Sequence, residues 1–97
     1  MWRVAFSEAA VRQWKRVPKS RRAVLRESIR RYLAEGDPLQ PGRNKFQLRR
    51  PSEHAEFELR VEPWRVFYRV RGRTVEVVLI GEKAGSKLVI EGEEFIL

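Results

Sequence analysis

The sequence lacks cysteine altogether, which excludes disulfide bonds and thiolate metal sites. It has one histidine, His54, and this excludes His-rich metal sites, a Ser-His-Asp triad and any mechanism that needs two histidines. No apolar run approaches the roughly 20 residues that cross a bilayer, and the N-terminal residues lack the uninterrupted apolar stretch of a signal peptide. We therefore expect a cytoplasmic protein with no cofactor, no bound metal and no membrane contact.

The chain has the size and composition of one ordinary globular domain. Its 97 residues are too few for two independent cores, so we expect a single domain over residues 1–97. Hydrophobic residues make up 42% of the chain and aromatic residues 10%, which suffices for a packed core and excludes a wholly disordered chain.

Positive charge dominates the composition and is unevenly spread. Lys and Arg number 21 against 13 Asp and Glu, which gives a net charge of +8, and 16 of the 21 are arginine. Residues 1–36 carry +7, residues 37–74 carry +4 and residues 75–97 carry −3. Arginine binds phosphates through two donors and stacks on bases. A basic body with an acidic tail predicts a polyanion or an acidic protein as partner, although a merely solvated charged surface has the same composition.

The first 36 residues predict one strand and two helices. Side chains alternate between apolar and other types over residues 2–6, which is the period of a strand. Ser7 fits a helix N-cap, and the helix that follows must end at Pro18, because proline has no N–H for the next turn. Apolar residues recur at helical spacing over residues 25–33 and predict a second helix, which starts near residue 19 and is stopped by Gly36.

The second half of the chain predicts strands. Alternating or β-branched runs cover residues 46–48, 57–61, 64–70 and 74–80, and a further short strand at 88–90 could pair with residues 77–80. We therefore expect an α+β fold of order β-α-α-β-β-β(-β), with both helices on one face of a mainly antiparallel sheet. The other face of that sheet then meets water or a partner.

Arg60 and Arg65 flank the short connection between the two clearest predicted strands. If these strands pair, the two guanidinium groups converge on one surface, which is costly without an anion. A phosphate or an acidic partner would relieve that repulsion. Alternatively, neighbouring carboxylates neutralise both arginines in an ordinary cross-strand network, the candidates being Glu56, Glu58 and Glu62. Both interpretations fit the strand pattern.

The chain resembles the RelE/ParE superfamily of type II toxins in its element order, length and basicity and in the segment ELRVEPWRVFYRV. The resemblance is sharpest at Leu59-Arg60 and at Trp64-Arg65-Val66-Phe67-Tyr68, and a strand ending in Ile-Gly follows. The segment FSEAAVRQWKRVPKSRR is similar to the family's first helix and the break after it. The resemblance implies a bacterial or archaeal toxin that a small acidic antitoxin, encoded beside it, neutralises in a hetero-oligomer.

Two activities are implied by this resemblance. Members of the RelE branch enter the ribosome and cut mRNA, whereas members of the ParE branch inhibit DNA gyrase and cut nothing. We expect a ribosome-dependent mRNA endonuclease (an mRNA interferase) that inhibits translation. The alternatives are a non-catalytic gyrase inhibitor or a catalytically degenerate toxin, and a weaker third is a plain nucleic-acid-binding domain.

The resemblance also implies site residues. In the RelE branch a basic residue at the position of Arg65 holds the scissile phosphate, and the basic residue after the strand-ending glycine corresponds to Lys83. The family's late tyrosine would fall near Val89, and no Tyr or His follows Tyr68. We expect the catalytic cations to be Arg65, Lys83 and Arg60, the acid or base to be Glu56, Glu58 or His54, and nucleic-acid binding to involve Lys45, Arg49, Arg22 and Arg26.

Overall fold

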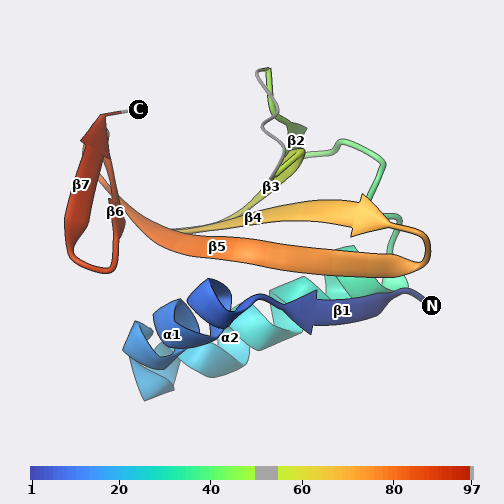
Figure 1. Cartoon of the computed structure of the whole chain (residues 1–97), viewed down its shortest axis with the longest axis horizontal. Helices are drawn as coiled ribbons and strands as arrows, with labels where there is room; N and C mark the ends of the chain where they lie inside the picture. The colour runs from blue at the N-terminus through green and yellow to red at the C-terminus, as the bar shows by residue number, and fades with distance from the viewer. Residues whose placement is uncertain (50–54, 97) are drawn as a thin grey trace.

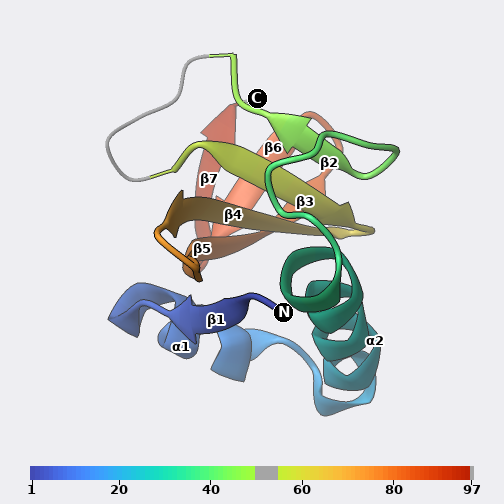
Figure 2. The same ribbon diagram turned by 90° about the vertical axis from the view of Figure 1, so that its right-hand side faces the viewer.

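The computed structural model describes residues 1–49 and 55–96. It has two helices packed against one side of a mostly antiparallel sheet, as Figures 1 and 2 show, and this confirms the α+β fold expected from the sequence. The elements in chain order are β1 (Arg3–Phe6), α1 (Glu8–Arg16), α2 (Lys19–Ile29), the π-helical turn η1 (Arg30–Glu35), β2 (Lys45–Gln47), β3 (Phe57–Val61), β4 (Trp64–Arg71), β5 (Thr74–Ala84), β6 (Lys87–Ile90) and β7 (Glu93–Ile96).

Strand β5 is the centre of the sheet, whose order is β2-β3-β4-β5-β6-β7. Strand β1 pairs in parallel with the first half of β5, up to Val77, and β6 pairs with Glu82–Ala84 at its other end. The expectation that residues 88–90 pair with 77–80 was therefore wrong, because the tight turn at Gly85-Ser86 places Lys87 opposite Ala84 and so pairs β6 with residues 82–84. Strand β7, which pairs with β6, was not expected from the sequence.

The breaks between β1 and the two helices follow from local chemistry. The Ser7 side chain accepts a hydrogen bond from the Ala10 amide at 3.0 Å and so caps α1, as predicted. Helix α1 ends at Arg16, and Pro18 opens α2. The Arg22 side chain donates to the carbonyl oxygens of Val17 at 2.9 Å and Lys15 at 2.7 Å. These donors satisfy carbonyls at the end of α1 that have no partner within the helix.

The hydrophobic core lies between the helices and the inner face of the sheet, the face that carries Val66 and Tyr68. The Tyr68 ring stacks on Phe57 with 5.3 Å between ring centroids, and its hydroxyl donates to the Pro38 carbonyl oxygen at 2.7 Å. Burial raises the pKa of Tyr68, so the hydroxyl keeps its proton and remains a donor. The contact ties β4 to the loop that follows the helices.

Among the described residues, no helix is long and apolar enough to cross a membrane.

A bulge in β5 keeps the core side chains before it and after it on the same side of the sheet. Phe67 pairs with Leu79 but Tyr68 pairs with Val77, so Val78 is an extra residue in β5. Without it, the alternation that places Val77 in the core would turn Ile80 outwards. With it, both Val77 and Ile80 are buried in the core.

Candidate functional site

A cationic hollow of about 560 Å³ opens on the outer face of the sheet, the face opposite the helices. It lies where the β3–β4 and β5–β6 hairpins meet. Its lining combines three basic side chains with one carboxylate, one ring and two small turn residues, namely Arg60, Arg65, Lys83, Glu58, Phe67, Gly85 and Ser86. We call this set the cationic hollow below.

Strand register brings the basic side chains of the hollow together. Arg60 on β3 stands opposite Arg65 on β4, so the two side chains leave the same face of the sheet. On its other side Arg65 stands opposite Gly81 of β5, and Lys83 follows two residues later on the same face. The β3–β4 turn, which contains a cis peptide bond before Pro63, accepts a hydrogen bond from the Lys83 amide at 2.7 Å. The expected convergence of Arg60 and Arg65 is therefore what the structure shows.

Arg65 is the most enclosed cation of the hollow, since only 5% of the residue is exposed. Its Nη2 lies 3.0 Å from Glu62 Oε1, its Nε lies 3.7 Å from Glu58 Oε1, and its Nη1 donates to the Trp64 carbonyl oxygen at 3.1 Å. The sheet, the turn and two carboxylates thus fix the orientation of this guanidinium group.

Arg60 shares Glu58 with Arg65. Its Nε donates to Glu58 Oε1 at 2.5 Å, and its guanidinium carbon lies 4.0 Å from the centroid of the Phe46 ring. The cross-strand carboxylate network anticipated as an alternative therefore exists, but it does not fill the hollow. The carboxylate interpretation is therefore confirmed in part, and the anion of the other interpretation stays a prediction.

The hollow suits an anion such as a phosphate. Three cations face one inner carboxylate, Glu58, whereas the side chain of Glu62 is 73% exposed. An ion pair with so exposed a carboxylate is worth only about 0–1 kcal/mol, so a phosphate could displace Glu62 from Arg65 at small cost.

Within residues 1–49 and 55–96, no group of three or more His, Cys, Asp or Glu could hold a metal ion.

The other predicted site residues that the structure describes lie away from the hollow. Glu56 accepts a hydrogen bond from the Val70 amide at 3.1 Å and pairs with Arg71 at 3.1 Å, towards the other end of the hairpin. Lys45 donates to the carbonyl oxygen of Asp37 at 2.7 Å, and burial lowers the pKa of its ammonium group. Arg26 lies over the Trp14 ring, and Arg49 is exposed. Arg22 caps the C-terminal end of α1. His54 lies outside the described residues.

Two contributors to the site were missed by sequence reasoning, namely Gly85 and Ser86, which line the hollow from the β5–β6 turn. Glu62, which the sequence already offered as a partner for the arginines, holds Arg65 from the β3–β4 turn. A signal for both missed residues existed, because the Gly-Ser pair that begins two residues after Lys83 predicts a tight turn. The Gly-Ser pair does not specify the direction of β6, however, and that direction decides whether the turn lies beside Arg65 of β4.

Comparison with known proteins identifies the family of the chain. The family model described as the ParE toxin of the type II toxin-antitoxin system parDE matches residues 4–85, all but the first three and the last twelve residues. No curated protein and no solved structure matches the chain significantly. The matched range includes both helices and every residue of the cationic hollow except Ser86. The chain therefore belongs to the ParE toxin family of type II toxin-antitoxin systems, within the RelE/ParE superfamily.

Proposed function

We propose that this toxin is a ribosome-dependent mRNA endonuclease that acts in the cytoplasm and inhibits translation. One observation carries the proposal: Arg60, Arg65, Lys83 and Glu58 line a single hollow of about 560 Å³. Cleavage of RNA through its 2′-hydroxyl needs added negative charge stabilised on a phosphate and a nearby group that accepts a proton. The hollow offers both, and the orientation of Arg65 is fixed before any substrate arrives.

The reaction assigns a role to each of these side chains. The ribose 2′-oxygen attacks the phosphorus and passes its proton to the carboxylate of Glu58, whose Oε1 accepts from Arg60. Arg65 and Arg60 stabilise the charge on the phosphorane oxygens. The bond to the 5′-oxygen breaks, and that oxygen takes a proton from Lys83. The products are a 2′,3′-cyclic phosphate and a 5′-hydroxyl, and the ribosome supplies the orientation of the mRNA.

A second candidate function is inhibition of DNA gyrase by binding alone. The match to the ParE family model favours it. The two carboxylates on Arg65 favour it as well, because a guanidinium that is already neutralised fits a structural role. In that case the hollow is an anchoring point for the target and no bond is broken.

One experiment separates the two functions. We expect that inducing the toxin arrests growth and that mapping transcript ends reveals new 5′-hydroxyl ends within translated reading frames. In vitro, purified toxin should cut mRNA only when ribosomes are present and should leave gyrase supercoiling unchanged. Intact transcripts together with inhibited supercoiling would overturn the endonuclease and support the second candidate.

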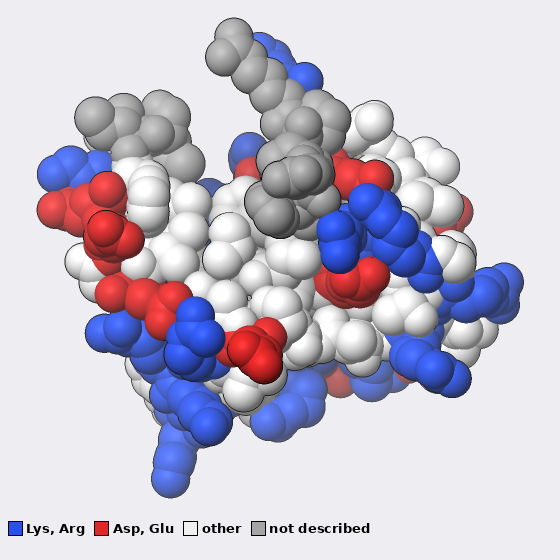
Figure 3. Space-filling model, in the orientation of Figure 1, with Lys and Arg blue, Asp and Glu red and all other residues white. Residues whose placement is uncertain are grey.

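We further infer that the cognate antitoxin docks a segment of apolar and acidic residues beside the hollow. An apolar groove of about 610 Å³ runs over the outer face of β4 and β5 to the hairpin and shares Phe67 with the hollow. Figure 3 shows uncharged side chains filling the middle of this view, with Lys and Arg gathered along its lower edge. The net charge of +8 selects an acidic partner. The apolar residues that line the groove include Leu48, Phe67, Val78, Leu79, Leu88 and Ile90.

Leu79→Asp is expected to weaken antitoxin binding at least about tenfold, because it places a charge in the apolar groove. The matched control is Val24→Asp, since Val24 is 61% exposed on α2 and lines neither cavity. Titration calorimetry with the purified antitoxin measures both. Equal affinity for Leu79→Asp and for the wild type would rule this docking surface out.

A further inference from the structure

The C-terminal hairpin, β6 with β7, is a part of this chain that the family match at residues 4–85 does not cover. Within the described part of the chain, the strand pairing that joins it to the rest of the sheet is with Glu82–Ala84 at the end of β5. Figure 1 shows that it stands across this end of the sheet, with the β6–β7 turn reaching back towards α1. Its other turn carries Gly85 and Ser86 into the cationic hollow. The position of the hairpin therefore sets one wall of the hollow.

The edge of β5 that leads to this hairpin is not covered by any strand among the described residues. Strand β1 stops pairing at Val77 and β6 starts at Glu82. Two side chains occupy the gap: the Ser7 hydroxyl donates to the Val78 carbonyl oxygen at 2.8 Å, and Gln13 Oε1 accepts from the Ile80 amide at 2.6 Å. Backbone groups that would otherwise be unsatisfied at this edge thus have partners.

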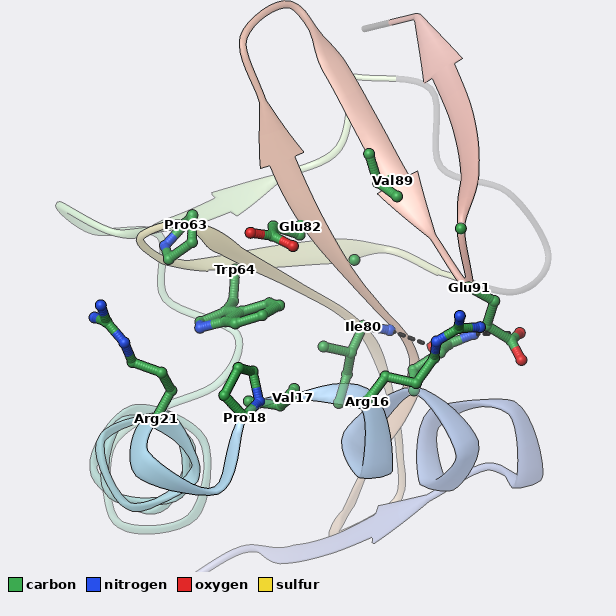
Figure 4. A pocket seen from close by; sticks show the side chains of 13 residues that line it. Arg16, Val17, Pro18, Arg21, Pro63, Trp64, Ile80, Glu82, Val89 and Glu91 are labelled. Carbon is green, nitrogen blue, oxygen red and sulfur yellow. Dashed lines mark hydrogen bonds between the residues drawn. The ribbon is translucent and has the colours of Figure 1, made fainter.

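Gln13 also reaches the hairpin itself. Its Nε2 donates to Glu91 Oε2 at 3.1 Å, and Arg12 Nε donates to Glu91 Oε1 at 3.1 Å. Figure 4 shows Ile80 and Glu91 among the residues that line a cavity between the two helices, the β3–β4 turn and the hairpin, with a dashed line marking the bond to the Ile80 amide. Glu91 lies in the β6–β7 turn with φ 51°, and the hydrogen bonds from Gln13 and Arg12 lower the pKa of its carboxyl group. Gln13 is only 4% exposed, so this amide is a buried link between the edge of β5 and the hairpin turn.

A movement of the hairpin would also move the Lys83 side of the hollow, because the packing between the hairpin and β5 is tight. Lys83 stands opposite Leu88 in the β5–β6 register. A Cβ on Gly81 would lie 2.9 Å from both Leu88 Cδ1 and Ile90 Cγ1, so these hairpin side chains sit directly over the backbone next to Arg65. Closely packed groups of this kind move together.

We propose that Gln13 is a positioning residue, which holds the C-terminal hairpin against α1 and thereby fixes the Lys83 side of the cationic hollow. Gln13 does not line the hollow, and it acts through Glu91 and the hairpin. The consequence for RNA cleavage rests on the proposed endonuclease activity. The consequence for the hairpin does not, because it follows from the hydrogen bonds alone.

The test is an exchange of partners between positions 13 and 91. Gln13→Glu keeps an oxygen for the Ile80 amide but places a carboxylate against Glu91, so the link to the hairpin breaks. We expect amide hydrogen exchange of residues 87–90 to become about tenfold faster or more, while that of Val66 and Val75 in the core stays unchanged. Ribosome-dependent cleavage should fall about tenfold in kcat, with little change in KM.

Combining Gln13→Glu with Glu91→Gln restores a donor opposite an acceptor, and it should return both readouts to within about threefold of the wild type. Glu93→Gln is the control, because it removes the same charge as Glu91→Gln from an exposed position on β7. It should alter neither the hairpin exchange nor the cleavage rate. Unchanged hairpin exchange in Gln13→Glu, or no rescue by the double variant, would overturn the proposal. Faster hairpin exchange with wild-type cleavage would overturn the positioning of Lys83. If the wild-type protein cuts no RNA, the proposed function fails, and the exchange data still decide whether Gln13 holds the hairpin.

Discussion

Arg65→Ala is expected to lower ribosome-dependent mRNA cleavage by about 100- to 1000-fold, the usual effect of removing one preorganised donor from a developing oxyanion. Arg65 is the buried cation of the hollow, and Glu58, Glu62 and the Trp64 carbonyl hold its guanidinium group in place. The loss should appear mainly in kcat, because the side chain is assigned to charge that forms during the reaction. Initial rates on ribosome-bound mRNA measure it.

Stability has to be separated from activity in this variant. Removing Arg65 leaves Glu58 paired with Arg60 and returns the exposed Glu62 to water, so we expect a loss of only about 1–3 kcal/mol in the free energy of unfolding. Arg65→Lys retains the charge but not the two-pronged geometry, and should recover part of the rate. Arg71→Ala is the matched control, because it removes the same charge from the same strand outside the hollow. Cleavage by Arg65→Ala equal to that of this control would exclude Arg65 from catalysis.

Much of the fold could be predicted from the sequence because its signals are local. The cap at Ser7 and the break at Pro18 each depend on a residue and its immediate neighbours. The alternation in β3 and β4 depends on which side of one strand faces the core. Such features leave a periodic pattern in the chain.

The features that were missed depend on contacts between distant segments. The pairing of β1 with residues 74–77 of β5 is one example, because it joins segments that lie more than seventy residues apart in the chain. The bulge at Val78 is similar, since its carbonyl oxygen accepts from Ser7. No pattern within residues 74–90 records either event, so local periodicity could not place them.

The site divides in the same way. Convergence of Arg60 and Arg65 could be predicted because one short turn fixes the register on both sides of it. The expected roles of Arg22 and Lys45 in binding nucleic acid remain untested, but each side chain has backbone carbonyl partners in another segment of the chain. A basic residue in a sequence looks the same whether it binds a ligand or stabilises a loop, and only the tertiary structure separates the two.

The second large effect is expected at Gly81, the glycine of the Ile80-Gly81 pair within β5. Its backbone needs no left-handed conformation, so the reason for glycine is space. An added Cβ would lie 2.9 Å from Leu88 Cδ1 and Ile90 Cγ1 and 3.2 Å from the Val89 carbonyl oxygen. Leu88 can rotate away at modest cost, but Ile90 Cγ1 lies close to its own backbone, and the carbonyl oxygen cannot move without the hairpin.

Gly81→Val should therefore lower the free energy of unfolding by about 3 kcal/mol, near the upper end of the usual cost of overpacking a tight site. Gly81→Ala should cost less, because the smaller clash is offset by the reduced entropy of the unfolded chain. Gly42→Val is the control: a Cβ there meets nothing within 4 Å, so the change should stay within about 0.5 kcal/mol. Chemical denaturation of the three variants gives these values. A Gly81→Val protein as stable as the control would mean that the hairpin yields freely, and a hairpin that yields freely could not hold Lys83 beside Arg65.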